Sequence, residues 1–344
     1  MKKTLNKLFK RNQQPISSRI TSETVAQHRE QILAGGRRFK YPIQYARHRL
    51  VINAIIISVV SLIVVVVVGW WQLYPSQNTS EFMYRITKVI PVPVATIDGQ
   101  SVLYSDYLMK YRSSLHYLEQ KEQLSLKTDD GKRQVEYIKQ QSMQDAIADA
   151  YAVKLAKDMN ISVSASELEG FLKSQRQSSS GEISQQTYNA VILDYYGWSP
   201  DEYKHATERK LLRQNVAYSM DKTAQSAVSV MKKALKDNQS TEFKSIVSLD
   251  VIKNMKVKVN FGTSGLVPKD NQDGGLSLAA SKLSKSQISS VVKSSMGDGY
   301  YFVKLIDINE TQVSYEYIQI PLTTFTNSLN KMMNTKKVDK YIKI

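Results

Sequence analysis

The chain has 344 residues, a formal net charge of +16 and no cysteine. The lack of cysteine excludes a disulfide framework, a thiolate nucleophile and a cysteine-bound zinc or iron–sulfur site. The four histidines are far apart in the sequence and lack the spacing that brings two imidazoles to one helix face, so we expect no metal site; they are His28, His48, His116 and His205.

Most of the positive charge lies in residues 1–49. This segment has twelve Lys and Arg but only two acidic residues, which gives it a net charge of +10. A basic arm attracts nucleic-acid phosphates without sequence preference, and a basic flank beside a membrane attracts anionic lipid head groups. Because the segment has few aromatic residues and no DNA-reading motif, we favour the lipid interaction and expect no specific nucleic-acid partner.

Residues 50–71 contain no charged side chain. A helix of this length extends about 33 Å, which matches the hydrocarbon core of a bilayer at roughly 30 Å. The mostly β-branched run 59–68 also fits a buried strand, but strands rarely exceed about ten residues. Trp70, Trp71 and Tyr74 follow where aromatic residues mark the membrane interface. The pattern predicts one transmembrane helix over residues 50–71.

The charge distribution also predicts the orientation of this helix. Basic flanks stay on the cytoplasmic side, so we expect a basic cytoplasmic tail over residues 1–49 and extracytoplasmic domains after residue 71, in a single-pass protein of the cell membrane. The alternative is a cleavable signal peptide, which has a short charged region, an apolar region of about 7–15 residues and a small-residue cleavage site. Residues 72–76 contain no such site, which favours an uncleaved anchor.

The first exported segment has the signals of a helical bundle introduced by a small β-turn. A strand, an Asp-Gly turn and a return strand occupy residues 94–102, and Ser105 is placed to cap the first helix. Ser164 and Glu167 fit a capping box. Further helical patterns lie at residues 132–159, 188–195 and 200–218.

After residue 220 the pattern changes to a mixture of helices and strands. A helical face at residues 224–235 precedes a strand pattern at 256–261, in which polar and apolar residues alternate. Glycine-rich loops follow at 262–265 and 274–275. The remaining predicted elements are a short helix at 276–283, strands at 300–306 and 313–320, and a Lys-rich helix at 325–344.

These patterns predict a mainly α fold with a small α+β module. After the tail and the transmembrane helix, the predicted segments are a linker over 72–93, a helical bundle over 94–220, an α+β module over 221–320 and a C-terminal Lys-rich helix over 321–344.

Three passages together resemble the SurA/PrsA class of exported chaperones and peptidyl-prolyl isomerases. Residues 94–107 are similar to that class's opening strand, turn and helix. Residues 145–168 are similar to its second helix, short turn and capped third helix, and residues 195–212 to its closing helix. Their order and spacing carry the resemblance over about residues 89–218, which implies a SurA N-terminal-like chaperone domain over 94–220.

Residues 283–305 resemble part of a parvulin-type isomerase module. The resemblance places Tyr301 where active parvulins carry a histidine, and Gln272 and Leu276 where they carry the Met and Phe of the proline pocket. Tyr317 lies in a segment that resembles the first strand of a parvulin. In this chain the segment follows the other strands of the module, which implies a permuted strand order. The alternative is that Tyr301 and Tyr317 are ordinary packing residues.

The chemistry of isomerisation indicates a degenerate module. The reaction must lower a rotation barrier of about 18–20 kcal/mol, which requires an apolar slot for the prolyl ring and polar groups tuned to the twisted amide. We expect a module without the parvulin histidines, and without the Met and Phe of the proline pocket, to keep its shape but to have weak or no activity. We therefore name no catalytic residue. If the protein is an enzyme at all, peptidyl-prolyl isomerisation is the expected reaction.

The leading functional hypothesis is a membrane-anchored extracytoplasmic chaperone that binds unfolded or nascent exported polypeptides. Tyr and Trp offer large contact area with a polar tip, and the candidate client contacts are Tyr188, Tyr195, Tyr196 and Trp198. The alternative for each is a core position. No phosphate-binding loop motif is present, so we expect no cofactor. An active isomerase and a non-catalytic surface scaffold or adhesion protein are the competing functions, while a hydrolase is disfavoured by the lack of a visible triad or carboxylate pair.

Overall fold

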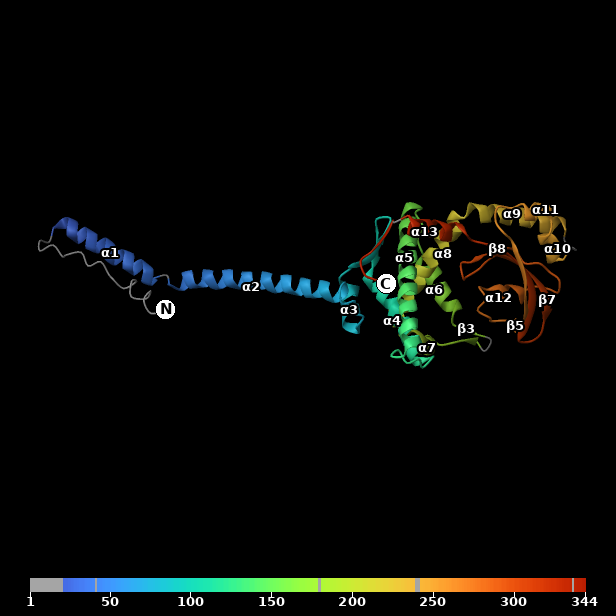
Figure 1. Ribbon diagram of the computed structural model, residues 1–344, viewed down its shortest axis with the longest axis horizontal. Coiled ribbons are helices and arrows are strands. Elements are labelled where there is room, and N and C mark those ends of the chain that lie inside the picture. Colours follow the sequence, from blue (N-terminus) through green and yellow to red (C-terminus); the bar gives the residue numbers. More distant parts are fainter. Residues whose placement is uncertain (1–20, 41, 179–180, 239–241, 336) are drawn as a thin grey trace. The chain divides into compact units, whose positions relative to one another are not determined.

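The computed structural model describes residues 21–40, 42–178, 181–238, 242–335 and 337–344. The chain divides into two units, residues 1–71 and 72–344 (Figure 1). Residues 1–20 of the predicted basic tail lie outside the described residues, as do the side chains of residues 35–47. The described chain is mainly helical with small antiparallel sheets, as predicted.

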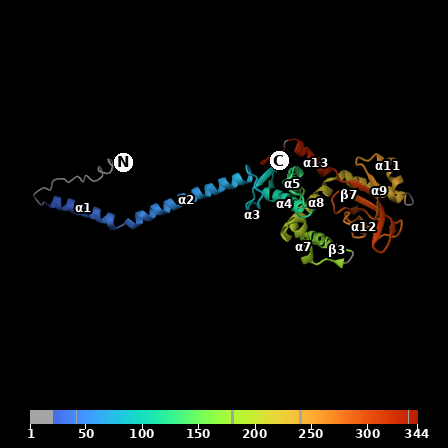
Figure 2. The same cartoon turned by 60° about the horizontal axis from the view of Figure 1, so that its bottom comes forward.

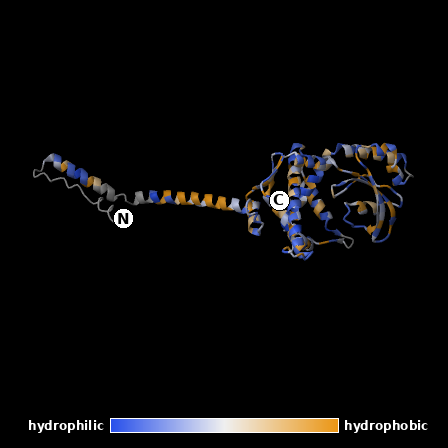
Figure 3. Cartoon of the chain, in the orientation of Figure 1, coloured by the Kyte–Doolittle hydropathy of each residue, from blue (hydrophilic) through white to orange (hydrophobic). Residues whose placement is uncertain are grey.

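The first unit holds α1 (Ser22–Lys40) and most of α2 (Pro42–Leu73). Within the described residues, one helical segment, His48–Leu73, is long and apolar enough to cross a membrane, and no residue of its most apolar 18-residue stretch is buried within the protein. Figure 3 shows the run of hydrophobic residues along the middle of α2. The predicted apolar helix is confirmed, and its orientation across a membrane stays a prediction.

The segment predicted as a linker contains a helix, α3 (Glu81–Val89). Ser80 caps this helix, since its side chain accepts a hydrogen bond from the backbone N–H of Met83. Met83, Tyr84 and Thr87 lie on one helix face and are buried in the bundle. The prediction of a linker is therefore wrong over these residues, because their apolar face supplies the packing that stabilises a short helix.

The bundle core forms around a β-hairpin and three long helices. The turn between the strands is at Asp98 and Gly99, both with positive φ, as a two-residue hairpin turn requires. The elements of this part are β1 (Pro93–Ile97), β2 (Gln100–Leu103), α4 (Tyr104–Gln120), α5 (Asp129–Asp158), α6 (Ala165–Ser174), β3 (Gln177–Ser178), β4 (Gly181–Glu182), α7 (Gln185–Tyr196) and α8 (Pro200–Met220). The predicted cap at Ser105 is not used, because α4 begins one residue earlier and its N-cap is Leu103.

The C-terminus returns to this bundle. The prediction of a helix over residues 325–344 is correct only as far as Asn334, where α13 (Thr324–Asn334) ends, and β9 (Val338–Lys340) follows. β9 pairs antiparallel with β1, which gives a sheet of order β2-β1-β9. This pairing satisfies backbone groups of β1 that an edge strand leaves unpaired, and the buried Ile342 adds apolar packing.

The remaining elements build a four-stranded antiparallel sheet with helices on both faces. They are α9 (Lys222–Asp237), α10 (Phe243–Val247), α11 (Asp250–Lys253), β5 (Asn260–Pro268), α12 (Leu276–Ala280), β6 (Val292–Lys293), β7 (Gly299–Ile308) and β8 (Gln312–Pro321). The strand order is β5-β8-β7-β6. Figures 1 and 2 show α9 and α11 on one side of β7 and α12 on the other.

Successive side chains along each strand point to opposite faces of this sheet, so the sheet has a separate apolar core on each face. Tyr300 and Phe302 of β7 join Phe243 of α10 and the residues of α9 in one core. Tyr301 and Val303 point to the other face and pack with α12. The first strand differs from the prediction, because β5 starts at Asn260 and continues through the predicted glycine-rich loop, with an irregularity between Thr263 and Leu266.

Candidate functional site

Helix α7 has an unusually exposed apolar surface. The helix begins after Ser184, whose side chain accepts from the N–H of Thr187, and ends at Gly197 in the left-handed conformation. Of its residues only Ile192 is buried. Four apolar or aromatic side chains are 43–57% exposed, and we call them the α7 surface: Val191, Leu193, Tyr195 and Tyr196. Figure 2 shows α7 at the edge of the bundle.

An aromatic cluster adjoins the α7 surface. Tyr196 stacks on Trp198 with ring centroids 5.0 Å apart and on Tyr203 at 6.4 Å. Tyr188 meets Tyr203 edge to face at 5.8 Å, and their hydroxyl oxygens lie 2.7 Å apart. The structure thus brings three of the four predicted client contacts together around Tyr203.

Tyr203 was not among the sequence candidates. It lies on α8, and its contact with α7 depends on how the two helices cross. Tyr195 lies apart from the cluster, where the Lys121 ammonium is 4.7 Å from its ring centroid. Trp198 is half-buried, its indole N–H donates to the backbone oxygen of Met109, and it packs against the bundle core. For Trp198 the geometry therefore combines a core role with an aromatic contact to the α7 surface.

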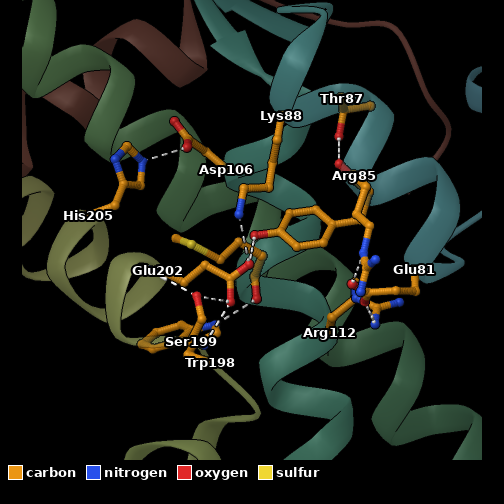
Figure 4. Close-up of polar contacts among 12 residues, drawn as sticks. Glu81, Arg85, Thr87, Lys88, Asp106, Arg112, Trp198, Ser199, Glu202 and His205 are labelled. Atoms are coloured by element: carbon orange, nitrogen blue, oxygen red, sulfur yellow. Dashed lines mark hydrogen bonds and ion pairs between the residues drawn. The ribbon is translucent and has the colours of Figure 1, made fainter. Parts of the chain in front are cut away.

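A polar network fixes the start of α8 beneath this cluster (Figure 4). Ser199 and Glu202 form a full capping box, in which the Glu202 carboxylate accepts from the backbone N–H of Ser199 at 2.8 Å. The same carboxylate accepts from the Tyr84 hydroxyl at 2.6 Å and from the Lys88 ammonium at 3.2 Å. α3 and α8 are thereby joined through one side chain.

These contacts set the protonation of the network. Burial alone raises the pKa of Glu202, but the hydrogen bonds from Tyr84, Ser199 and Lys88 outweigh it and hold the pKa of Glu202 below its usual value. Burial and the neighbouring Glu202 carboxylate raise the pKa of Tyr84. At neutral pH the pair is therefore a phenol that donates to a carboxylate. Figure 4 also shows His205 beside Asp106, with its Nε2 2.9 Å from the carboxylate.

Three of the four positions that the parvulin resemblance singled out meet on one face of the sheet. The rings of Tyr301 and Tyr317 have centroids 5.7 Å apart, and Leu276 is buried in the same apolar core. Gln272 is exposed in the loop between β5 and α12 and does not join them.

The hydroxyl of Tyr301 is fully engaged. It donates to the Asp298 carboxylate at 2.6 Å and accepts from the Gln319 amide at 2.7 Å. Burial and the Asp298 carboxylate raise the pKa of Tyr301, so the phenol keeps its proton at neutral pH. Tyr315 makes the same kind of contact, since its hydroxyl donates to Asp273 at 2.6 Å. These hydroxyls are structural partners of two loop carboxylates, the exposed Asp298 and the half-buried Asp273.

A cleft of about 550 Å³ lies where the bundle meets the sheet. Its walls come from α6, α8 and the region of β6, and include Phe171, Leu211, Tyr218 and Lys293. The Tyr218 hydroxyl closes its base by donating to the backbone oxygens of Ser294 and Gly299. The lining of this cleft is mixed in polarity.

Comparison with known proteins places this architecture in a family. No curated protein matches the chain in sequence. The family model of the SurA-like N-terminal domain matches residues 44–217, from within α2 to within α8. Since this match covers just over half of the 344 residues, the chain belongs to the SurA-like N-terminal domain family.

Proposed function

We propose that this protein is a membrane-anchored extracytoplasmic chaperone that binds unfolded exported polypeptides through the α7 surface. The observation that carries the proposal is the exposure of four apolar or aromatic side chains along one helix, beside an aromatic cluster. Membership of a family of the chaperone type supports the same function.

The chemistry of the α7 surface suits clients of varied sequence. Val191 and Leu193 offer only apolar area, while Tyr195 and Tyr196 add hydroxyls that accept or donate hydrogen bonds at the rim. Burying one such side chain fully stabilises a complex by about 1.5–3 kcal/mol, and association costs much of the sum. The result is weak, reversible binding, which lowers the concentration of aggregating chains by mass action without ATP.

The proposal assigns the membrane segment as an uncleaved anchor. The apolar segment His48–Leu73 has the length for a single pass, and the basic residues before it favour a cytoplasmic N-terminus. The bundle and the sheet then lie outside the cytoplasm, where exported chains emerge unfolded. The basic tail contacts anionic lipid head groups on the inner side.

The sheet is proposed as a degenerate parvulin-like module with weak or no isomerase activity. β8 lies between β5 and β7, the position that a permuted first strand would occupy, and this order supports the resemblance. The engaged Tyr301 hydroxyl and the exposed Gln272 support the loss of activity, because neither offers a free polar group or an apolar slot to a twisted prolyl bond.

The test measures how the full chain in detergent or nanodiscs suppresses the aggregation of several unrelated unfolded proteins. The variant Val191→Ser/Leu193→Ser removes apolar area from α7. The variant Val251→Ser/Leu278→Ser is the matched control, since these side chains are 57% and 54% exposed on α11 and α12. We expect client affinity to fall about tenfold or more for the α7 variant alone, from a loss of roughly 1.5 kcal/mol or more.

Each other outcome points to a different function. Equal effects of the two variants contradict the α7 surface as the client site. Binding to a single partner with no general suppression favours a scaffold or adhesion protein. Rapid turnover of a proline peptide, lost in Tyr301→Phe, would establish an active isomerase and overturn the inactive module.

A further inference from the structure

Helix α3 carries an exposed apolar face opposite to the one that packs on the bundle. At 100° per residue, Phe82 and Val89 point in nearly the same direction, and the buried Met83, Tyr84 and Thr87 point away from it. Val89 is 82% and Phe82 70% exposed, the two highest values among the large apolar side chains in the described part of the chain. Ile90 extends this face with 55% exposure.

The inner face of α3 is held firmly, so the outer face has a fixed direction. Tyr84 and Lys88 bond to Glu202 on α8. Glu81 pairs with Arg112 of α4, which also donates to the backbone oxygen of Thr79 at 2.8 Å. Contacts at both ends of the helix keep it from rotating its apolar face into the bundle.

The chain between the apolar segment and α3 is short and ordered. The Tyr104 hydroxyl donates to the backbone oxygen of Leu73 at 2.7 Å, and the backbone N–H of Asn78 donates to Gln72 at 2.8 Å. Leu73 lies in the same core cluster as Met83 and Tyr84. The last residue of the candidate span is thus packed in one core with α3, and no free linker separates them.

We propose that the outer face of α3, formed by Phe82, Val89 and Ile90, inserts into the interface of the lipid bilayer beside the end of α2. The inference rests on the membrane anchoring in the proposed function and is independent of client binding. The occupant follows from continuity along the chain, because the inner face of α3 shares a core with Leu73, the last residue of the candidate span. Arg85, whose side chain is 75% exposed on the same side of the helix, reaches the head groups while its stem stays along the apolar face.

This contact orients the chaperone. A transmembrane helix alone leaves the exported domain free to tilt about its anchor. A second apolar contact a few residues away restricts that tilt, as interfacial helices do when their apolar face lies in the boundary between head groups and acyl chains.

The natural absence of cysteine makes the inference directly testable. Full-length Val89→Cys and Leu278→Cys, each labelled with one fluorophore, are reconstituted into phosphatidylcholine vesicles, and flotation checks the anchoring. We expect nitroxide-labelled lipid to quench the label at residue 89 and aqueous iodide to quench the label at residue 278. Adding Phe82→Ser shifts the label at residue 89 toward water by about tenfold in the insertion equilibrium, while the unfolding midpoint and client binding stay unchanged.

The outcomes separate the two proposals. Failure to float refutes the membrane anchor. If the protein floats but iodide reaches both labels equally, α3 does not insert. If the label at residue 89 is protected from iodide and also from lipid nitroxide, protein covers the face, and the lipid assignment is wrong.

Discussion

The carboxylate of Asp221 ties the sheet to the bundle, and its removal should destabilise residues 72–344 strongly. Asp221 is 1% exposed at the junction of α8 and α9. Its Oδ1 accepts from the backbone N–H of Ala224 at 2.9 Å and caps α9. Its Oδ2 accepts from the N–H groups of Thr323 and Thr324, at 2.8 and 3.0 Å, where the chain leaves the sheet and enters α13.

The magnitude follows from these three bonds. Loss of the cap costs about 1 kcal/mol, and hydrogen bonds to a charged group contribute about 1.5–3 kcal/mol each. Because Thr323 and Thr324 share one oxygen, we count their two bonds as about 3 kcal/mol together. Asp221→Ala should therefore lower the free energy of unfolding by about 4 kcal/mol, or about 10 °C in midpoint at 2–4 °C per kcal/mol.

Circular dichroism during thermal and urea unfolding measures this change. Asp221→Ser keeps an oxygen that caps α9 but does not reach Thr323, so it should lose only about 3 kcal/mol. Asp237→Ala, at the exposed C-terminal end of the same helix, is the control and should change stability by less than about 0.5 kcal/mol. A result for Asp221→Ala within about 1 kcal/mol of the parent would refute the reasoning.

Two further predictions concern packing and protonation. In Gly299→Ala the new Cβ would lie 2.5 Å from the backbone oxygen of Ile320, so β7 and β8 must separate. The free energy of unfolding, measured by urea titration, should fall by about 1–3 kcal/mol. Gly170→Ala places its Cβ in open space on α6 and should instead stabilise the protein by up to about 1 kcal/mol in the same measurement. Since the pKa of Glu202 is lowered in the folded state, its stabilisation is present above the ordinary value of 4.5 and is lost as the pH falls through the folded-state value. The protection of the α3 amides, measured as the hydrogen-exchange rate relative to the intrinsic rate at each pH, should thus fall on acidification in the parent but much less in Glu202→Gln. Equal pH responses would contradict this assignment.

The sequence predicted helices best where the signals are local. The helix predicted over residues 200–218 is present as α8, and Ser199 and Glu202 form a complete capping box at its start. At Ser164 only half of the predicted box forms: its hydroxyl accepts from the N–H of Glu167, but the Glu167 carboxylate accepts from the Asn215 amide on α8 instead. A tertiary partner thus outcompetes the backbone within the box.

The sequence predicted poorly where the partner is distant. β9 pairs with a strand more than 230 residues away, and the surrounding lysines favoured a helix. The same limit applies to the candidate site, because Tyr188, Tyr196 and Trp198 were predicted as separate contacts while Tyr203, which joins them, depends on the packing of α7 against α8. Residue type indicated which side chains are candidate contacts for apolar surface, and only the helix crossing determines which of them meet.

The contrast between the two tyrosine-rich regions favours binding over catalysis. On the sheet, the hydroxyls of Tyr301 and Tyr315 are committed to Asp298 and Asp273, and their rings are buried, so neither of these two hydroxyls is left for a reacting amide. On α7 the apolar area is uncovered while the supporting polar groups, such as Glu202, are satisfied below it. A rigid base with an adaptable apolar surface binds many sequences weakly, which is what a chaperone without an energy source requires. If this contrast holds, Tyr301→Phe should leave client binding unchanged, and Val191→Ser/Leu193→Ser should weaken it without lowering the unfolding midpoint, because both side chains are already exposed.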